Sequence, residues 1–161
     1  MNLIITFLAS FLIWLMFAGL VVLWAIDGKI KKEQVIHALI ASFLAWMIAQ
    51  IIKRLLPYPR PFLINGKPPL TITSETDGSF PSAHAALAFG LATTIWLHDR
   101  KVGWLYLILA CVIGIARVLA NVHFPVDILG GDLVGIITSF AVEKIHFKNL
   151  FKKGRFYNKG A

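Results

Sequence analysis

Six ionisable side chains lie at the ends of apolar segments, where a charged group is costly and therefore indicates a functional site. They are Lys53, Arg60, His84, Arg117, His123 and Asp127. Three of them are cations, and arginine in particular binds phosphate oxygens through two parallel hydrogen bonds. The set predicts a binding site for a multiply charged anion, and phosphate fits it best.

Two histidines and an aspartate supply the reactive groups. Asp127 follows His123 by four residues, so its carboxylate can turn back and hold one ring N–H of that histidine. The second ring nitrogen can then attack phosphorus and form a phosphohistidine, which water hydrolyses. His84 remains to protonate the leaving group as a general acid. We therefore predict His123 as the nucleophile and Asp127 as the residue that orients it.

Two helix N-termini are predicted beside these residues. Pro81 and Pro125 suit the first position of a helix, where a missing N–H has no cost. The free N–H groups of a helix start attract anions, so we assign Ser82 and the backbone amide of Ala83 to substrate binding. Capping of the helix is the alternative role for the Ser82 hydroxyl.

A metal site is the main alternative use for the two histidines and Asp127, because their side chains are acceptable metal ligands. Lys53, Arg60 and Arg117 would repel a metal ion from the same place. We therefore expect neither a metal nor another cofactor. For Lys53 a second alternative is an interfacial lysine that extends its ammonium to water, and for the neighbouring Arg54 this is the preferred interpretation.

The chain that carries these residues is strongly apolar. Of its 161 residues, 58% are hydrophobic and only 15% are charged, whereas soluble domains have about a quarter charged. Apolar runs cover residues 3–26, 34–56, 83–97, 102–119 and 125–143. A membrane helix needs about 20 apolar residues, so buried or re-entrant helices are an alternative for the third and fifth runs. We favour a single all-α domain over 1–161 with five transmembrane helices and the site at the non-cytoplasmic edge.

The basic residues indicate an orientation. Five spans place the 27–33 loop, the 98–101 turn and a basic tail over about 144–161 on one face, with eleven of the sixteen lysines and arginines. The positive-inside rule puts that face and the C-terminus in the cytoplasm, and the site outside or in the periplasm. Charge that flanks membrane segments in this way points to a lipid bilayer as partner and not to nucleic acid. The oligomeric state stays open.

Three motifs resemble a known family. Lys53-x6-Arg60-Pro61, Pro81-Ser82-Ala83-His84 and Arg117-x5-His123-x3-Asp127 resemble the signature motifs of the type 2 phosphatidic acid phosphatase superfamily. The motifs cover residues 53–127. The resemblance implies a metal-independent membrane phosphatase with the histidine and aspartate roles given above. The sequence departs from the family at Ala83, usually glycine, and at Ala116, usually serine, and many members have six membrane helices.

The predicted activity is hydrolysis of a lipid phosphate or diphosphate. The resemblance favours undecaprenyl diphosphate or a related isoprenoid or glycerolipid phosphate. A lipid phosphotransferase with the same intermediate is an alternative enzyme, and a small anion transporter is an alternative of another class, although a transporter needs polar groups at the membrane midplane. The 61–80 loop fits a lid or a solvated connector, and Asp132 fits a supporting role or helix packing.

Overall fold

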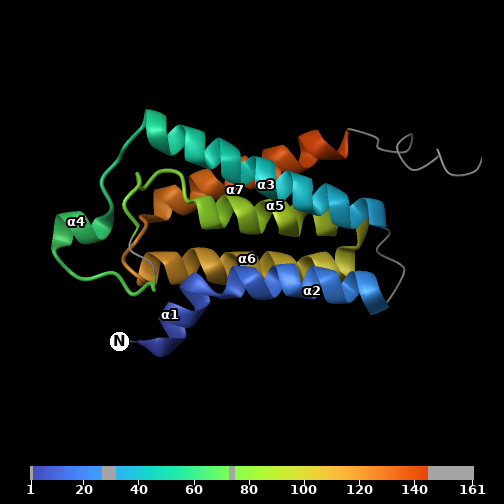
Figure 1. The fold of residues 1–161 in the computed structure, drawn as a ribbon, viewed down its shortest axis with the longest axis horizontal. Helices are drawn as coiled ribbons and strands as arrows, with labels where there is room; N and C mark the ends of the chain where they lie inside the picture. Colours follow the sequence, from blue (N-terminus) through green and yellow to red (C-terminus); the bar gives the residue numbers. More distant parts are fainter. Residues whose placement is uncertain (1, 27–31, 73–74, 145–161) are drawn as a thin grey trace, which may run out of the picture.

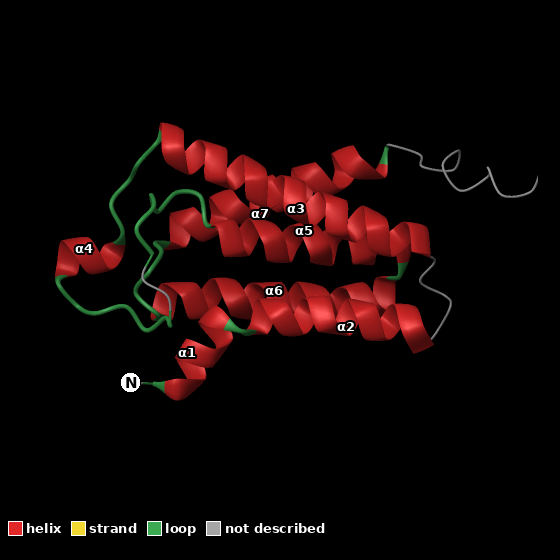
Figure 2. Ribbon diagram, in the orientation of Figure 1, coloured by secondary structure: helices red, strands yellow, loops and turns green. Residues whose placement is uncertain are grey.

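The computed structural model describes residues 2–26, 32–72 and 75–144, and all regular structure in these ranges is helical (Figures 1 and 2). The helices are α1 (Leu3–Ser10), α2 (Leu12–Ile26), α3 (Lys32–Leu55), α4 (Pro61–Asn65), α5 (Ala83–His98), α6 (Arg100–Leu119) and α7 (Pro125–Glu143). The predicted all-α class is confirmed. The predicted basic tail beyond Lys144 lies outside the described residues.

Helix α5 is the centre of the bundle. It lies between α3 and α7 on one side and α6 on the other (Figure 1), and eleven of its sixteen residues are buried. Small residues let the neighbouring backbones approach closely. At Gly135 of α7, for example, a side-chain Cβ would stand only 2.7 Å from the carbonyl oxygen of Ala86 in α5. The close packing of α5 holds the residues at its N-terminal end in a fixed place relative to α3 and α7.

Within the described residues, three helices are long and apolar enough to cross a membrane, namely α3, α6 and α7. The pair α1–α2 makes a fourth if its two bent halves count as one span. Large apolar side chains such as Ile108, Ile115, Leu133 and Ile137 point away from the bundle and are more than half exposed, as expected for surfaces in contact with lipid. The chain is therefore a multi-pass membrane protein.

The sequence predicted one continuous helix over residues 3–26, and this prediction is wrong. The helix breaks at Phe11, and α1 and α2 are inclined by 53°. At the break the Arg117 guanidinium donates to the backbone carbonyl of Ala9 at 3.3 Å. A side chain that binds a helix carbonyl can bend the helix, and here the bend coincides with a contact between segments far apart in the sequence.

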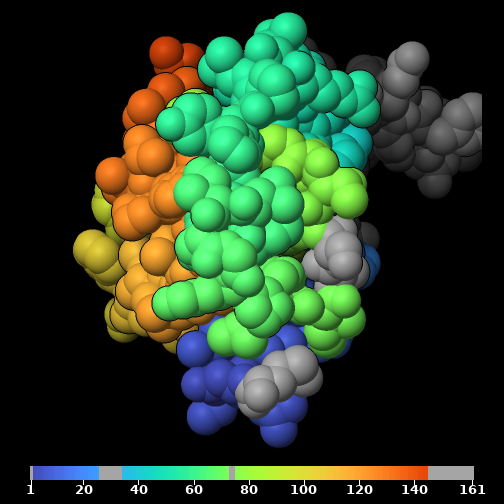
Figure 3. All heavy atoms as spheres, turned by 90° about the vertical axis from the view of Figure 1, so that its left-hand side faces the viewer, coloured from blue at the N-terminus to red at the C-terminus, as the bar shows by residue number. Residues whose placement is uncertain are grey.

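The segment between α3 and α5 closes one end of the bundle. Figure 3 looks onto this end, where the green segment that includes α4 lies across the molecule. Helix α4 ends at Gly66, whose φ of 67° is the left-handed conformation that glycine adopts readily. Side-chain amides of Asn65 and Asn121 then hydrogen bond at 2.7 Å, and Leu70 N–H donates to Ala120 at 2.9 Å. The loop is thereby tied to the turn between α6 and α7.

Candidate phosphate site

Arg60 is held by backbone carbonyls at the start of α4. Its Nη1 donates to the Val122 carbonyl and its Nε to the Asp77 carbonyl, both at 3.0 Å. The whole side chain is buried. Prolines at 57, 59 and 61 restrict the backbone on both sides of it. Because these carbonyl oxygens fix the guanidinium plane, the other N–H groups of Arg60 also point in fixed directions.

Lys53 is a buried residue in the last turn of α3, and it binds the same carboxylate as Arg60. Its Nζ lies 3.0 Å from Oδ2 of Asp77, and Nη2 of Arg60 lies 2.5 Å from Oδ1 of the same residue. Lys53 is 3% exposed, whereas Asp77 is exposed. The two predicted cations therefore meet at the mouth of the site. Arg54, next in sequence, is exposed and takes no part in this cluster.

His123 is oriented by Asp127, as its spacing suggested. Nδ1 of His123 lies 3.4 Å from Oδ2 of Asp127, which also accepts the Phe124 N–H at 2.8 Å. The Ser79 hydroxyl donates to the same carboxylate oxygen. With Nδ1 turned toward Asp127, Nε2 faces the guanidinium of Arg60, and Nη1 lies 3.3 Å from it. The ring nitrogen left to contact a ligand is therefore Nε2, and it faces Arg60.

Glu75 occupies the space between the two arginines. Its Oε2 lies 2.6 Å from Nη1 of Arg60 and 4.0 Å from Nε2 of His123, and its Oε1 pairs with Nη2 of Arg117. Burial pushes the pKa of Glu75 upward, but the guanidinium groups of Arg117 and Arg60 outweigh it and hold the pKa at about 2. Glu75 is thus an anion at neutral pH. A phosphoryl group that binds both arginines must take the place of this carboxylate.

His84 and Ala83 lie on the wall of a cavity of about 770 Å³ that Lys53, Glu75 and Asp77 also line. Ser82, one residue earlier, is fully buried, and its hydroxyl accepts the Ala85 N–H at 3.4 Å. In this structure the Ser82 side chain therefore caps α5, which is the alternative role considered for it. Phosphate binding by Ser82 and Ala83 stays a prediction.

The cavity continues away from the charged residues as an apolar groove between α2 and α3. The walls of the groove are formed by Ile13, Trp14 and Phe17 of α2, Leu39, Phe43 and Trp46 of α3, and Leu87 of α5. From Lys53 to Leu39 the groove follows α3 for roughly 20 Å at 1.5 Å per residue. One cavity thus joins a cationic end to an apolar channel, the combination that a lipid with a phosphate headgroup requires.

The structure brings all six predicted ionisable residues to one end of the bundle. Arg60, Arg117 and His123 surround Glu75, while Lys53 and His84 line the adjoining cavity. Sequence reasoning missed Glu75, Asp77 and Ser79, although the acidic residues precede the Pro81 motif closely. They lie in a loop, where polar residues are common and do not by themselves indicate a functional site.

The protonation state of His123 gives a testable pH dependence. Burial of the imidazole and the nearby cations lower the pKa of His123 to about 4, although the hydrogen bond to Asp127 opposes this shift. Above this pH the imidazole is neutral and nucleophilic, and below it Nε2 carries a proton. We expect kcat/KM to fall on the acid side with a midpoint near 4, well below the usual histidine value of about 6.5.

The pH profile is measured as the initial rate of phosphate release at low substrate concentration. The pKa of the substrate phosphate is determined separately, so that its own ionisation near pH 6 can be subtracted. A remaining acid midpoint at 6.5 or above would contradict the neutral state assigned to His123.

Comparison with known proteins connects this geometry to a family. The chain matches the model of the PAP2 superfamily over residues 34–151. It is 34% identical over 142 residues to the bacitracin transport permease protein BcrC of Bacillus licheniformis, covering 88% of this chain and 70% of that protein. It is 31% identical to the undecaprenyl-diphosphatase BcrC of Bacillus subtilis, covering 75% of this chain but only 62% of the relative.

Solved structures agree with this relationship. The crystal structure of LpxE from Aquifex aeolicus is 26% identical with a TM-score of 0.67, covering 90% of this chain and 88% of that one. A phosphatidylglycerolphosphate phosphatase of Bacillus subtilis shares the fold with a TM-score of 0.57 at 24% identity, over 89% of this chain and 70% of that chain. The family match spans more than half of the chain and includes every residue of the phosphate cluster. The chain therefore belongs to the PAP2 superfamily.

Proposed function

We propose that this protein is a membrane lipid phosphatase that works through a phosphohistidine on Nε2 of His123. One observation carries the proposal. An anion, the Glu75 carboxylate, is bound between Arg60 and Arg117 with an oxygen 4.0 Å from that nitrogen. The phosphoryl group of a substrate would bind in the same place.

The reaction follows from this position. The phosphoryl group displaces Glu75 and is bound by Arg60, Arg117 and Lys53, which stabilise the charge on its equatorial oxygens. Nε2 of His123 forms a bond to phosphorus as the bond to the leaving oxygen breaks. His84 donates a proton to that oxygen. In the second step His84 takes a proton from water, the water oxygen attacks phosphorus, and inorganic phosphate leaves with His123 neutral again.

The groove between α2 and α3 supports a substrate with a long apolar tail. The name of the Bacillus subtilis relative, undecaprenyl-diphosphatase, makes an isoprenoid diphosphate the first candidate, and a glycerolipid phosphate is the second. The phosphate would bind at the cationic end while the tail followed the apolar wall of α3. The headgroup can then reach the site without leaving the membrane interface.

The proposed topology has five crossings, by α1–α2, α3, α5, α6 and α7. Helix α5 has sixteen residues, and because its neighbours enclose it, it crosses without the long apolar surface that a lipid-facing helix needs. Five crossings place the turn at residues 98–101 and the end of α7 opposite the phosphate site (Figure 1). The concentration of basic residues on that side supports a cytoplasmic C-terminus and a site facing outside or the periplasm.

The activity is tested by phosphate release from a panel of lipids in detergent micelles with EDTA present. The panel comprises undecaprenyl diphosphate, phosphatidic acid and phosphatidylglycerophosphate. We expect inorganic phosphate without any added acceptor, which distinguishes hydrolysis from phosphoryl transfer to another lipid and from anion transport. No phosphate from any member of the panel would reject the proposed function.

A substitution in the groove tests where the lipid tail binds. Leu87→Trp fills the apolar channel beside His84 and excludes two or three methylene groups of the tail, each worth about 0.8 kcal/mol. We expect kcat/KM for a long-chain substrate to fall at least about tenfold, while a short, water-soluble phosphate ester is hydrolysed at nearly the original rate. Leu87→Met, which conserves volume, is the control. An equal loss for both substrates would place the tail elsewhere.

A further inference from the structure

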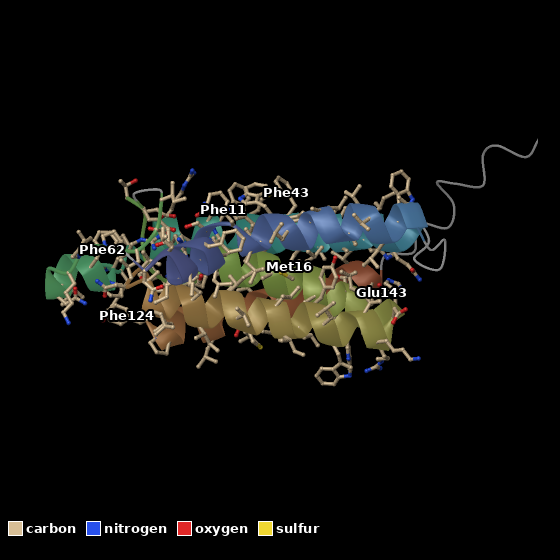
Figure 4. The ribbon with its side chains drawn as sticks, turned by 90° about the horizontal axis from the view of Figure 1, so that it is seen from below. Phe11, Met16, Phe43, Phe62, Phe124 and Glu143 are labelled. Carbon is tan, nitrogen blue, oxygen red and sulfur yellow. The ribbon has the colours of Figure 1, made fainter. Side chains whose placement is uncertain are left out.

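A second cluster of potential ligands lies at the end of the bundle opposite the phosphate site. It contains His37 of α3, His98 at the end of α5 and Glu143 at the end of α7. Figure 4 shows Glu143 at the other end of the helices from Phe124, the residue that follows His123. We propose that these three side chains form a binding site for Zn²⁺ or a divalent transition metal with the same ligand preferences.

The distances between the three ligand atoms suit a single ion. Nε2 of His98 lies 3.0 Å and Nδ1 of His37 lies 3.5 Å from Oε2 of Glu143. All three atoms lie within 4.8 Å of one another. Ligands at 2.0–2.1 Å from a tetrahedral zinc are about 3.3 Å apart. The two separations from Glu143, 3.0 and 3.5 Å, lie close to this value.

The missing hydrogen bonds of the buried ligand atoms also favour a shared ion. Nε2 of His98 and Oε2 of Glu143 are buried and only 3.0 Å apart, yet neither atom has a hydrogen-bond partner among the described residues. A buried polar atom without a partner is costly. A cation bound between the two atoms would satisfy both of them.

The chemistry of the ligand set selects the class of metal. Imidazole nitrogens with one carboxylate oxygen are typical ligands of zinc. The His37 side chain is 5% exposed and the Glu143 side chain 35% exposed, so the site is held by the bundle and reaches its surface at Glu143. An ion would enter by movement of the Glu143 side chain, and a water molecule would complete the tetrahedron.

Metal binding here would act on the fold and not on phosphate chemistry. The three ligands come from α3, α5 and α7, so one ion would join the ends of three helices that pack together. The catalytic histidines lie at the other end among Lys53, Arg60 and Arg117, which repel cations. We therefore expect EDTA to lower the Tm of the purified protein while its initial rate of phosphate release is unchanged.

The site is tested by equilibrium dialysis of the full chain against Zn²⁺, after metal removal and with a purification tag that lacks histidine. We expect one tightly bound equivalent. His98→Gln and Glu143→Gln should each weaken binding at least about tenfold, because loss of even an outer partner of a metal ligand costs that much. The double variant His84→Ala/His123→Ala should still bind one equivalent, since its changes lie at the other end.

Phosphate release by His98→Gln and Glu143→Gln confirms that the two variants are folded. A second measurement does not use the His98→Gln and Glu143→Gln variants. Zinc-edge X-ray absorption of the zinc-loaded His84→Ala/His123→Ala protein should show two imidazole ligands. Unchanged Zn²⁺ affinity in both single variants, no bound Zn²⁺ in the folded wild type, or fewer than two imidazoles at the zinc would each overturn the proposal.

Discussion

Replacing His123 with alanine is expected to reduce phosphate release by at least about 10³-fold. Removal of a nucleophile that works with an orienting partner abolishes nearly all turnover, because the remaining groups bind the substrate but cannot form the covalent intermediate. Nε2 of His123 is the ring nitrogen that faces Arg60, at 3.3 Å from its Nη1. The measurement is the initial rate of inorganic phosphate release with EDTA present.

A matched control for this change is His98→Gln, which alters a histidine at the other end of the bundle. It should keep the wild-type rate. Binding of vanadate, an analogue of the phosphoryl group, should persist in His123→Ala, because the arginines that bind the anion are intact. A His123→Ala protein that is folded and retains a tenth or more of the activity would show that another residue attacks phosphorus.

Substitution of Arg60 by lysine is expected to lower kcat/KM by about 10²- to 10³-fold, although the positive charge is kept. Nη1 of the guanidinium donates to the carbonyl of Val122 and also contacts the anion position now taken by Glu75, while Nε donates to the carbonyl of Asp77. A lysine ammonium is a point charge on a flexible stem and cannot do both. Kinetics on the same substrate panel measure the effect.

The control for Arg60→Lys is Arg54→Lys, the same chemical change at the exposed end of α3. This variant should hydrolyse all substrates at the wild-type rate. If Arg60→Lys keeps half of the wild-type kcat/KM or more, the site needs only a positive charge at this position, and the double role assigned to the Arg60 guanidinium is wrong.

The membrane class and the phosphate cluster were predictable because both depend on residues that are unusual for their surroundings. Long uncharged runs such as 3–26 have few explanations other than a bilayer. Charged residues such as Lys53 and Arg117 at the ends of such runs stand out for the same reason. Their motif spacing then limited the chemistry to phosphate, and the helices bring them to one end of the bundle.

The parts that the sequence did not predict depend on contacts between distant segments. Glu75, Asp77 and Ser79 lie in a loop of ordinary polar composition, and contacts with distant segments hold them at the site, such as the bond from Ser79 N–H to the Tyr58 carbonyl at 2.8 Å. No proline or glycine near Phe11 indicates the break in the sequence. The break instead accompanies the hydrogen bond from Arg117 to the Ala9 carbonyl.

The second histidine cluster was missed for the same reason. Nothing in the sequence spacing of His37 and His98 connects them with Glu143. Only the packing of α3, α5 and α7 places their ligand atoms within 4.8 Å of one another.

Direct detection of the covalent intermediate tests the central claim most directly. Labelled lipid phosphate is mixed with the protein for a time shorter than one turnover, the reaction is stopped in alkali, and the labelled peptide is identified by mass spectrometry. We predict phosphate on the imidazole of His123 and none on the His123→Ala protein. Label on His84 or another residue, or rapid turnover with no labelled histidine, would contradict the mechanism.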